Sequence, residues 1–331
     1  MPPAGSSDGD LTAAQDGAWI DHPSGYLALA AANERLRLPG VPGFVAYRQH
    51  GKHLVAFGGV HAPPGDRGRL LDGLMAHARE RRRRVLAIQV RGDQVALFAE
   101  RGFTVNRFGT SYGVGLAGYR FAGTPKMKLR NKIKRASASL EVLEVGRDLP
   151  RTSETFAGLN AISAAWLAAK GKKEIEFMVG ELGTPEQVER RIFVARVRGG
   201  GLAGFVTYVP VWGAHPGYLH DLSRRAPDAP VGVMEIINST ALRRFQEEDV
   251  PYLHFGFTPF IVDGPEPPGA GRLLSKTIGL LARYGTAIYP AQTQASYKLK
   301  WGPALVETEF IAGRPLGVRA VADLLLLTRS L

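Results

Sequence analysis

The chain has 331 residues and 45% hydrophobic content, which is enough for two domains with packed cores. It has no cysteine, and this excludes disulfides, thiolate metal sites and cysteine nucleophiles. The formal net charge is +12, a surplus that attracts nucleic acid, an anionic membrane surface or a phosphorylated small molecule. A generally basic solvated surface would give the same total, so the placement of the cations matters more than their number.

We expect neither a secretory signal at the N-terminus nor a membrane span. Residues 1–20 lack the basic start and apolar run of a secretory signal, and they predict a disordered tail. The longest apolar run, residues 324–327, is far shorter than the roughly 20 residues that a membrane span needs. The eight histidines are scattered without the spacing of a metal-ligand set. We therefore expect a cytoplasmic protein with no metal site.

The first half, residues 21–124, is expected to form one α/β domain. Residues 25–38 have partly helical spacing, and the runs GFVAYRQ and HLVAFGG predict a hairpin. A loop rich in proline and glycine follows, and then an amphipathic helix with its apolar stripe over residues 70–78. The remaining elements are a strand (VLAIQV), a helix (DQVALFAERG) and a strand over residues 103–108.

The second half, residues 125–331, repeats this order of elements. The predicted segments are a helix around residue 166, the strands RIFVARV, LAGFVTYVP and GYLHDL, a helix over 233–245, the strand YLHFGF, a helix over 272–284 and a last stretch containing Tyr297, Trp301 and Phe310. A repeat of this length indicates a duplicated domain. The order predicts a tandem pair of acetyltransferase-like α/β domains with central mixed sheets.

This fold first raises the possibility of acyl-CoA binding, for which bare amides at a helix N-terminus must hold a pyrophosphate. The only formal match to the usual loop is RVRGGG, which lies between two strands and is expected to be a hairpin turn. Where the loop belongs, the chain has Pro227 and Pro230, and the first half has Pro63 and Pro64. Because proline has no N–H to donate, an acyl-CoA N-acyltransferase is disfavoured.

A strongly basic segment joins the two halves. Six of the ten residues from 126 to 135 are cationic: Lys126, Lys128, Arg130, Lys132, Lys134 and Arg135. Met127, Leu129 and Ile133 give one apolar side of a helix. Cations over most of a helix repel one another unless a polyanion is near, so we expect this helix to contact tRNA or phosphate. A solvated linker helix is the alternative.

Several segments together resemble one known family. They are AYRQHGKHLVAFGGVHAPP, QVRGDQVALFAERGF, KMKLRNKIKRA, ISAAWLAAKGKKEIEFMVGEL, residues 221–260 and SYKLKWGPALVETEF. In collinear order over about residues 40–315, they are similar to the C-terminal catalytic domain of the phosphatidylglycerol lysyltransferase (aminoacyl-phosphatidylglycerol synthase) family. The resemblance implies a tandem acetyltransferase-like fold and transfer of an amino acid from aminoacyl-tRNA to an acceptor, with no cofactor. We expect no counterpart of the family's membrane-embedded N-terminal domain, and this expectation favours similarity to soluble stand-alone relatives.

The resemblance also places candidate site residues. The family's DxxR falls on Asp221 and Arg224, its MD becomes Met234 and Glu235, and its late KxKF becomes residues 298–301. Glu235 is one methylene longer than the family's aspartate, so the sequence alone does not define the hydrogen bond that its carboxylate makes. Asp221 is expected to orient the acceptor or the aminoacyl ammonium, or to accept a proton, with Arg224 fixing its carboxylate. A simple surface ion pair is the alternative.

Other candidates would bind the two substrates. Lys298 and Lys300 are expected to share one face of a strand and to contact tRNA phosphates or a developing oxyanion, with a solvated strand face as the alternative. Trp166 and Trp301 could stack the terminal adenine, although a lone tryptophan is also typical of a core. Glu174 is a candidate for amino-acid recognition. The histidines at 220 and 254 are expected to be structural.

The first prediction is therefore an aminoacyl-tRNA-dependent transferase with a soluble small-molecule or peptide acceptor bearing an amine, hydroxylamine or hydroxyl, as in antibiotic biosynthesis. The alternatives are aminoacylation of phosphatidylglycerol or a related lipid by peripheral contact with an anionic membrane, and a non-catalytic tRNA-binding module.

Overall fold

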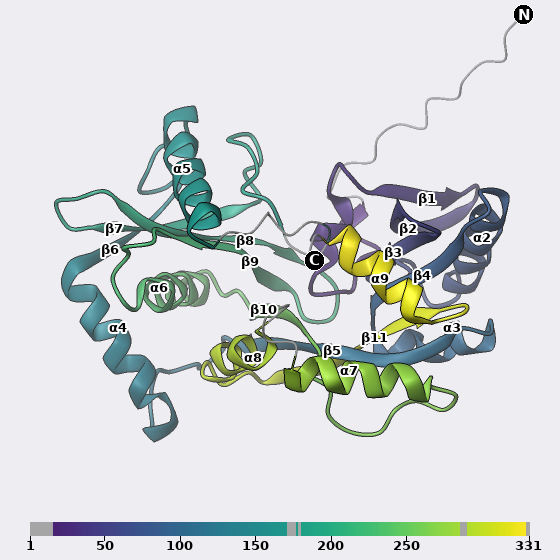
Figure 1. Ribbon diagram of the computed structural model, residues 1–331. Helices are drawn as coiled ribbons and strands as arrows, with labels where there is room; N and C mark the ends of the chain where they lie inside the picture. Colours follow the sequence, from purple (N-terminus) through teal and green to yellow (C-terminus); the bar gives the residue numbers. More distant parts are fainter. Residues whose placement is uncertain (1–15, 171–176, 178–179, 285–289, 329–331) are drawn as a thin grey trace, which may run out of the picture.

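The strands form one mixed sheet that runs through both halves of the molecule. The computed structural model describes residues 16–170, 177, 180–284 and 290–328, and its eleven strands lie in the order β1-β2-β3-β4-β11-β5-β10-β9-β8-β7-β6 (Figure 1). The strands are β1 (Glu34–Leu38), β2 (Val41–His50), β3 (His53–Phe57), β4 (Arg84–Val90), β5 (Thr104–Gly115), β6 (Leu140–Glu144), β7 (Arg191–Val197), β8 (Leu202–Val211), β9 (Gly217–Arg225), β10 (Tyr252–Pro259) and β11 (Leu305–Gly313).

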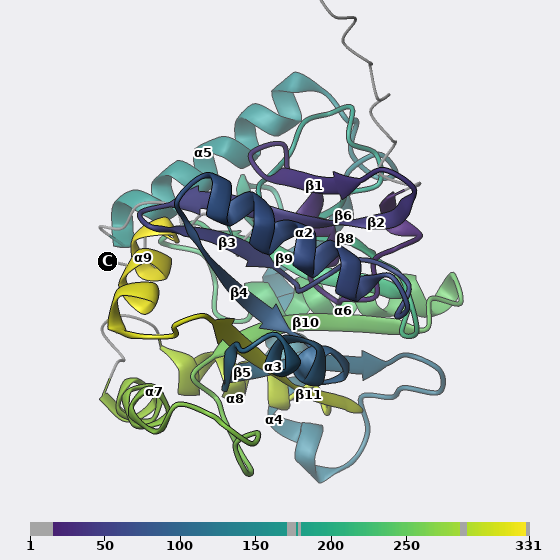
Figure 2. The ribbon, with the colours of Figure 1, turned by 90° about the vertical axis from the view of Figure 1, so that its right-hand side faces the viewer.

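Helices cover both faces of the sheet. They are α2 (Arg67–Glu80), α3 (Val95–Glu100), α4 (Met127–Ser139), α5 (Ser153–Lys170), α6 (Val233–Glu247), α7 (Arg272–Tyr284), α8 (Ala291–Leu299) and α9 (Val318–Leu327), with short 3-10 turns η1 (Gly25–Leu29), η2 (Gly92–Gln94) and η3 (Thr124–Lys126). In the second half, α5 and α6 pack on opposite faces of β7, β8 and β9 (Figures 1 and 2). Their apolar stripes bury two separate core clusters.

The halves exchange their last strands. β5 follows β4 in the chain, yet it pairs antiparallel with β10 of the second half. β11 comes from the end of the chain, and it lies between β4 and β5. This pairing confirms the tandem acetyltransferase-like arrangement with mixed sheets. Strand pairing joins residues before position 124 to residues after position 125. The expected domain boundary between these positions stays a prediction.

Most predicted elements are present, and two are wrong. Residues 25–38 form η1 and then β1, because Glu34–Leu38 pairs with β2 and this pairing overrides a weak helical pattern. Lys298 lies in the last turn of α8 and Lys300 just beyond it, so they are not on a strand as predicted. The glycines of RVRGGG form the β7–β8 turn, as expected, with the Val197 amide donating to the Gly201 carbonyl at 3.0 Å.

A bulge in β9 sets the direction of the polar residues at its end. The register with β8 shifts between the pairs Val206↔Ser223 and Tyr208↔His220, which leaves an extra residue on β9. The Thr207 hydroxyl accepts from the Leu222 amide at 3.0 Å and so satisfies the backbone there. The bulge turns Asp221 away from His220 and toward the segment that leads into β7.

Asp221 anchors that segment. Its carboxylate accepts from the Arg190 guanidinium at 2.7 Å and from the Gly180 amide at 2.8 Å, and both charged side chains are almost completely buried. A Cβ added at Gly180 would lie 1.6 Å from Asp221 Oδ2, so only glycine fits. The expected pairing of Asp221 with Arg224 is wrong, because the bulge separates their directions.

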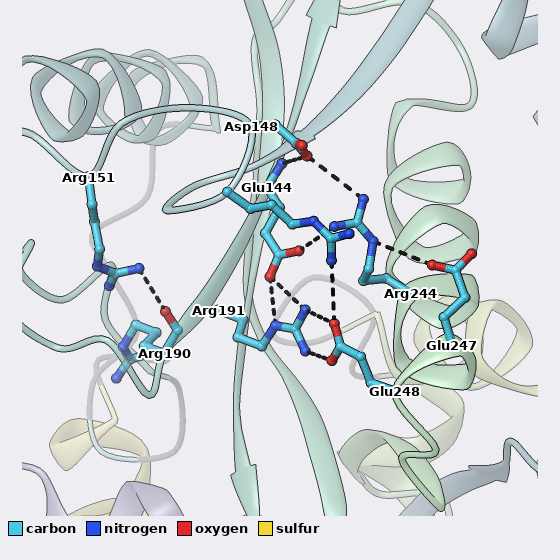
Figure 3. Close-up of polar contacts among 9 residues, drawn as sticks. Glu144, Asp148, Arg151, Arg190, Arg191, Arg244, Glu247 and Glu248 are labelled. Carbon is cyan, nitrogen blue, oxygen red and sulfur yellow. Dashed lines mark hydrogen bonds and ion pairs between the residues drawn. The ribbon is translucent and has the colours of Figure 1, made fainter.

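A second ion-pair network fixes the far end of α6 (Figure 3). The Arg191 guanidinium contacts Glu144 at 2.7 Å and also pairs with Glu248, while Arg244 contacts Glu144 at 3.2 Å. Glu144 is buried at the end of β6, so the network joins the sheet edge to the C-terminus of α6. With one end of α6 held in this way, its N-terminus has a fixed position over the sheet.

Asp221→Asn is expected to lower the free energy of unfolding by about 3–5 kcal/mol, because it leaves the buried Arg190 cation uncompensated. Chemical denaturation would measure this. Asp93→Asn is the matched control: it breaks the exposed pair with Arg67, which is worth about 0–1 kcal/mol. Equal losses for the two variants would contradict the anchoring role.

Candidate active site

A cavity opens where two parallel strands of the sheet separate. β9 and β10 pair only from Gly217↔Tyr252 to Leu219↔His254, and beyond this point each keeps only its other neighbour. The space between the separated ends and the N-terminus of α6 is a cavity of about 580 Å³. Its apolar wall contains Leu27, Phe108, Leu219, Val233, Phe255, Phe257, Phe260 and Leu324, and its polar wall contains His220, Asp221, Glu235, Tyr297 and Lys298.

Lys298 lies at the point of separation. Its Nζ donates to the carbonyl oxygens of Gly256 at 3.0 Å and of Phe257 at 2.8 Å. Gly256 has φ +69°, and the bulge there turns these carbonyls away from the ladder. Burial lowers the pKa of Lys298 to about 7, although the negative charge of Glu309 opposes the shift. An ammonium has three N–H donors, so one remains for the cavity.

Glu235 lies in the first turn of α6 and binds two lysines. Its Oε1 accepts from Lys132 Nζ and from Lys300 Nζ, each at 2.7 Å. Burial alone would raise the pKa of the Glu235 carboxyl, but the two lysine hydrogen bonds hold it below its ordinary value. The hydrogen bonds of the Glu235 carboxylate, which the sequence did not define, are thus made to two lysines. It joins α4, α6 and the end of α8.

Arg224 and Trp166 lie on the other face of the sheet from α6. The Arg224 guanidinium stacks over the Trp166 ring of α5 at 4.4 Å from its centroid. Because Arg224 covers one face of the indole, Trp166 offers an adenine at most its other face. Neither residue lines the cavity, whereas Asp221 does.

Trp301 is part of the core, and the prediction that it stacks an adenine is wrong for this structure. Its side chain is fully buried, and its ring stacks on Phe255 at a centroid distance of 5.3 Å. The apolar residues around it leave no access for a base. Glu174 lies outside the described residues.

The basic helix α4 is present, but only half of its cations face solvent. Lys126 lies 3.6 Å from the centroid of the Tyr119 ring, Arg130 donates to the carbonyl oxygens of Phe121 and Gly123, and Lys132 pairs with Glu235. These contacts occupy three of the six predicted tRNA-binding residues. The exposed cations are Lys128, Lys134 and Arg135.

Sequence reasoning missed a polar network on α6. Asn238 is buried within a predicted apolar helix face, and its side chain hydrogen-bonds to His220, Tyr208 and Tyr297. His220 was expected to be structural, but it lines the cavity. One signal in the sequence could have indicated the contact between Asn238 and His220. An asparagine on the apolar face of a helix needs a buried hydrogen-bond partner, and a strand histidine lies eighteen positions before it.

The described residues contain no cluster of three metal-ligating side chains, and none of their helices is long and apolar enough to cross a membrane. At the start of α6 the Val233 amide already donates to the Pro230 carbonyl at 3.3 Å, and Glu235 places a negative charge in the first turn. Lys132 and Lys300 compensate that charge, and the sequence-based argument against CoA stays a prediction.

Comparison with known proteins gives a consistent match. The family model for the phosphatidylglycerol lysyltransferase C-terminal domain matches residues 17–313. Curated relatives include the lysylphosphatidylglycerol biosynthesis bifunctional protein LysX of Mycobacterium leprae, 23% identical over 53% of this chain and 15% of that protein. The equivalent protein of Mycolicibacterium gilvum is 23% identical over 43% of this chain and 13% of that protein. The chain thus matches only a small part of these relatives.

Solved structures have the same fold. The DUF2156 domain of an Agrobacterium fabrum protein assigned as lysylphosphatidylglycerol synthetase superposes with TM-score 0.77 at 19% identity, covering 97% of this chain and 99% of that one. L-PGS from Bacillus licheniformis gives TM-score 0.77 at 17% identity, with 93% and 91% coverage. FemX gives TM-score 0.54 at 10% identity, with 92% and 96% coverage. The family predicted from the sequence is confirmed: this chain belongs to the phosphatidylglycerol lysyltransferase C-terminal family.

Proposed function

We propose that this protein transfers an aminoacyl group from aminoacyl-tRNA to a hydroxyl or amine nucleophile. The observation that carries the proposal is the cavity between β9 and β10. It places a lysine with one free N–H and an ionised glutamate within one space, beside a helix with exposed cations. Family membership supports the same reaction class.

The residues of the cavity suit an ester that is already activated. The tRNA ester needs positioning, removal of a proton from the nucleophile and stabilisation of the tetrahedral oxyanion. The third N–H of Lys298 can donate to that oxyanion. Glu235 Oε2 has no hydrogen-bond partner among the described side chains, so it can accept from the aminoacyl ammonium. Lys300 would keep Glu235 ionised, and Asp221 would hold the segment beside the cavity in place.

The donor would reach the cavity from the α4 side. Lys132 of α4 lines the cavity through its contact with Glu235, and Lys128, Lys134 and Arg135 face solvent on the same helix. These exposed cations would bind phosphates of the tRNA near its acceptor end. Lys126 and Arg130 would instead shape the helix start.

The surface of α7 favours a lipid headgroup as the acceptor. Leu274 and Ile278 of α7 pack into the apolar cluster that also supplies Phe108 and Phe260 to the cavity wall. The outer face exposes Leu273 and Leu280, which are 71% and 58% exposed. Three exposed cations flank these leucines: Arg272, Lys276 and Arg283. Leucines among cations fit an anionic bilayer surface. The expected soluble acceptor in antibiotic biosynthesis stays a prediction.

The reaction is tested by incubating the protein with a mixture of radiolabelled aminoacyl-tRNAs and vesicles of phosphatidylglycerol and phosphatidylcholine. We expect label in the chloroform phase, and less of it for Leu273→Asn with Leu280→Asn, because α7 then binds the bilayer weakly. Gly279→Asn on the same helix is the control, because a Cβ added at Gly279 would meet no other atom within 4 Å. Label only on added hydroxylamine or ethanolamine would favour a soluble acceptor, and tRNA binding without any transfer would favour a binding module.

Lys298 gives a pH-dependent signature. If its ammonium stabilises the oxyanion, activity falls as the pH rises through about 7, where this lysine loses its proton. Arginine keeps its charge over the whole pH range of the assay. The remaining activity of Lys298→Arg is therefore expected to show no fall as the pH rises through about 7. Lys298→Met should lose most turnover. An unchanged alkaline limb in the arginine variant would show that another group titrates.

The exposed cations of α4 are expected to determine the salt dependence of tRNA binding. Replacing Lys128, Lys134 and Arg135 by alanine should reduce the slope of log Kd against log salt by about 2, since each phosphate contact contributes about 0.7–0.9. The control replaces Arg79, Arg82 and Arg84, which lie around the end of α2 at the opposite end of the molecule (Figure 1). Equal slopes for the two triple variants would remove α4 from the tRNA contact.

A further inference from the structure

The buried amide of Asn238 fixes the protonation state of the His220 ring. Asn238 Nδ2 lies 2.8 Å from the Met234 carbonyl, which can only accept, so the amide orientation is determined. Asn238 Oδ1 then faces the Tyr208 hydroxyl at 2.9 Å and His220 Nδ1 at 2.8 Å. An amide oxygen only accepts, so His220 must carry its proton on Nδ1. The lone pair is therefore on Nε2.

That Nε2 atom is open to the cavity. His220 lines the cavity, and no described residue hydrogen-bonds its Nε2. The Nε2 of His22, in contrast, is sealed from solvent without a hydrogen bond. The β9 bulge contributes to this position, because His220 stays on the α6 face while the Asp221 carboxylate binds Arg190 and the Gly180 amide. The imidazole is thus held at one edge by α6 and is available at the other.

The surroundings keep the ring neutral. Burial lowers the pKa of His220 to about 4; the Asn238 hydrogen bond opposes this shift, and the Lys298 cation adds to it. Two tyrosines also belong to this network: the Tyr208 ring of β8 packs edge-on against His220, and the Tyr297 hydroxyl of α8 accepts from Asn238 Nδ2. Burial raises the pKa of both phenols. Neither tyrosine carries charge at neutral pH. A neutral imidazole with a fixed tautomer is the form that accepts a proton.

We propose that His220 is the general base of the transfer, with Asn238 as its positioning residue; this rests on the proposed function. The proton of the acceptor O–H or N–H moves to His220 Nε2 as the acceptor atom attacks the ester carbonyl. When the tetrahedral intermediate collapses, the ester bond to the tRNA ribose breaks. The imidazolium then returns the proton to the ribose oxygen. Lys298, beside His220, would face the oxyanion.

His220 differs from the neighbouring histidine on β10. His254 is buried, and burial lowers its pKa to about 4 as well. Its Nε2, however, is occupied by the His215 carbonyl at 2.9 Å, and it does not line the cavity. His254→Gln is therefore the matched control for His220→Gln.

The test uses the full chain with radiolabelled aminoacyl-tRNA and phosphatidylglycerol vesicles. His220→Gln is expected to lower kcat by about 10²–10⁴-fold with unchanged Kd for aminoacyl-tRNA, since this is the range of general acid–base catalysis. His254→Gln should turn over like the parent protein. Added imidazole should restore turnover to His220→Ala. Asn238→Asp should move the acid limb of kcat/KM to higher pH, because a carboxylate stabilises the imidazolium.

A separate readout needs no turnover. NMR of the protein with isotope-labelled imidazole nitrogens is expected to show the His220 proton on Nδ1, and a proton on Nε2 would overturn the proposal. Normal kcat in His220→Gln, or a folded His220→Ala that imidazole does not restore, would overturn it while leaving the transferase function intact. A parent protein that transfers no label to vesicles, hydroxylamine or ethanolamine would overturn the proposed function and this role with it.

Discussion

The separation of β9 from β10 is the constraint on which the rest of the site depends. Parallel strands that part after Leu219 and His254 leave backbone carbonyls without a ladder partner. Lys298 satisfies two of these carbonyls and is buried by doing so, which lowers its pKa. The same separation opens the cavity and places α6 above it. The separation of two parallel strands thus forms a cavity with apolar and polar walls.

Some cations of this protein form ion pairs inside the molecule, and others face solvent. Although the net charge is +12, many of its cations are paired: Arg190 with Asp221, and Lys132 and Lys300 with Glu235. Buried or half-buried charges must be paired, because desolvation of a lone charge costs several kcal/mol, on the order of the stability of a domain. The cations on α4 and α7 that stay in solvent are among those that can meet an external polyanion.

The exchange of strands between halves explains why the site draws on the whole chain. β5 brings Phe108 from the first half to the cavity wall, and α9 brings Leu324 from the end of the chain. Residues from both halves of the chain consequently line one cavity. The site is held by the same hydrogen bonds that hold the fold.

The sequence by itself determined the family, the order of most elements and the basic helix, because periodicity and motif spacing are local properties. It did not determine the strand exchange, since the partner of β11 is more than 180 residues away in the chain. It placed Lys298 on a strand, because alternation over five residues cannot distinguish a strand from the end of a helix. Only the tertiary structure decided that Asp221 pairs with Arg190, that Trp301 is core, and that Asn238 faces His220. A bulge and the packing of α6 set these directions, and neither leaves a periodic signal in the sequence.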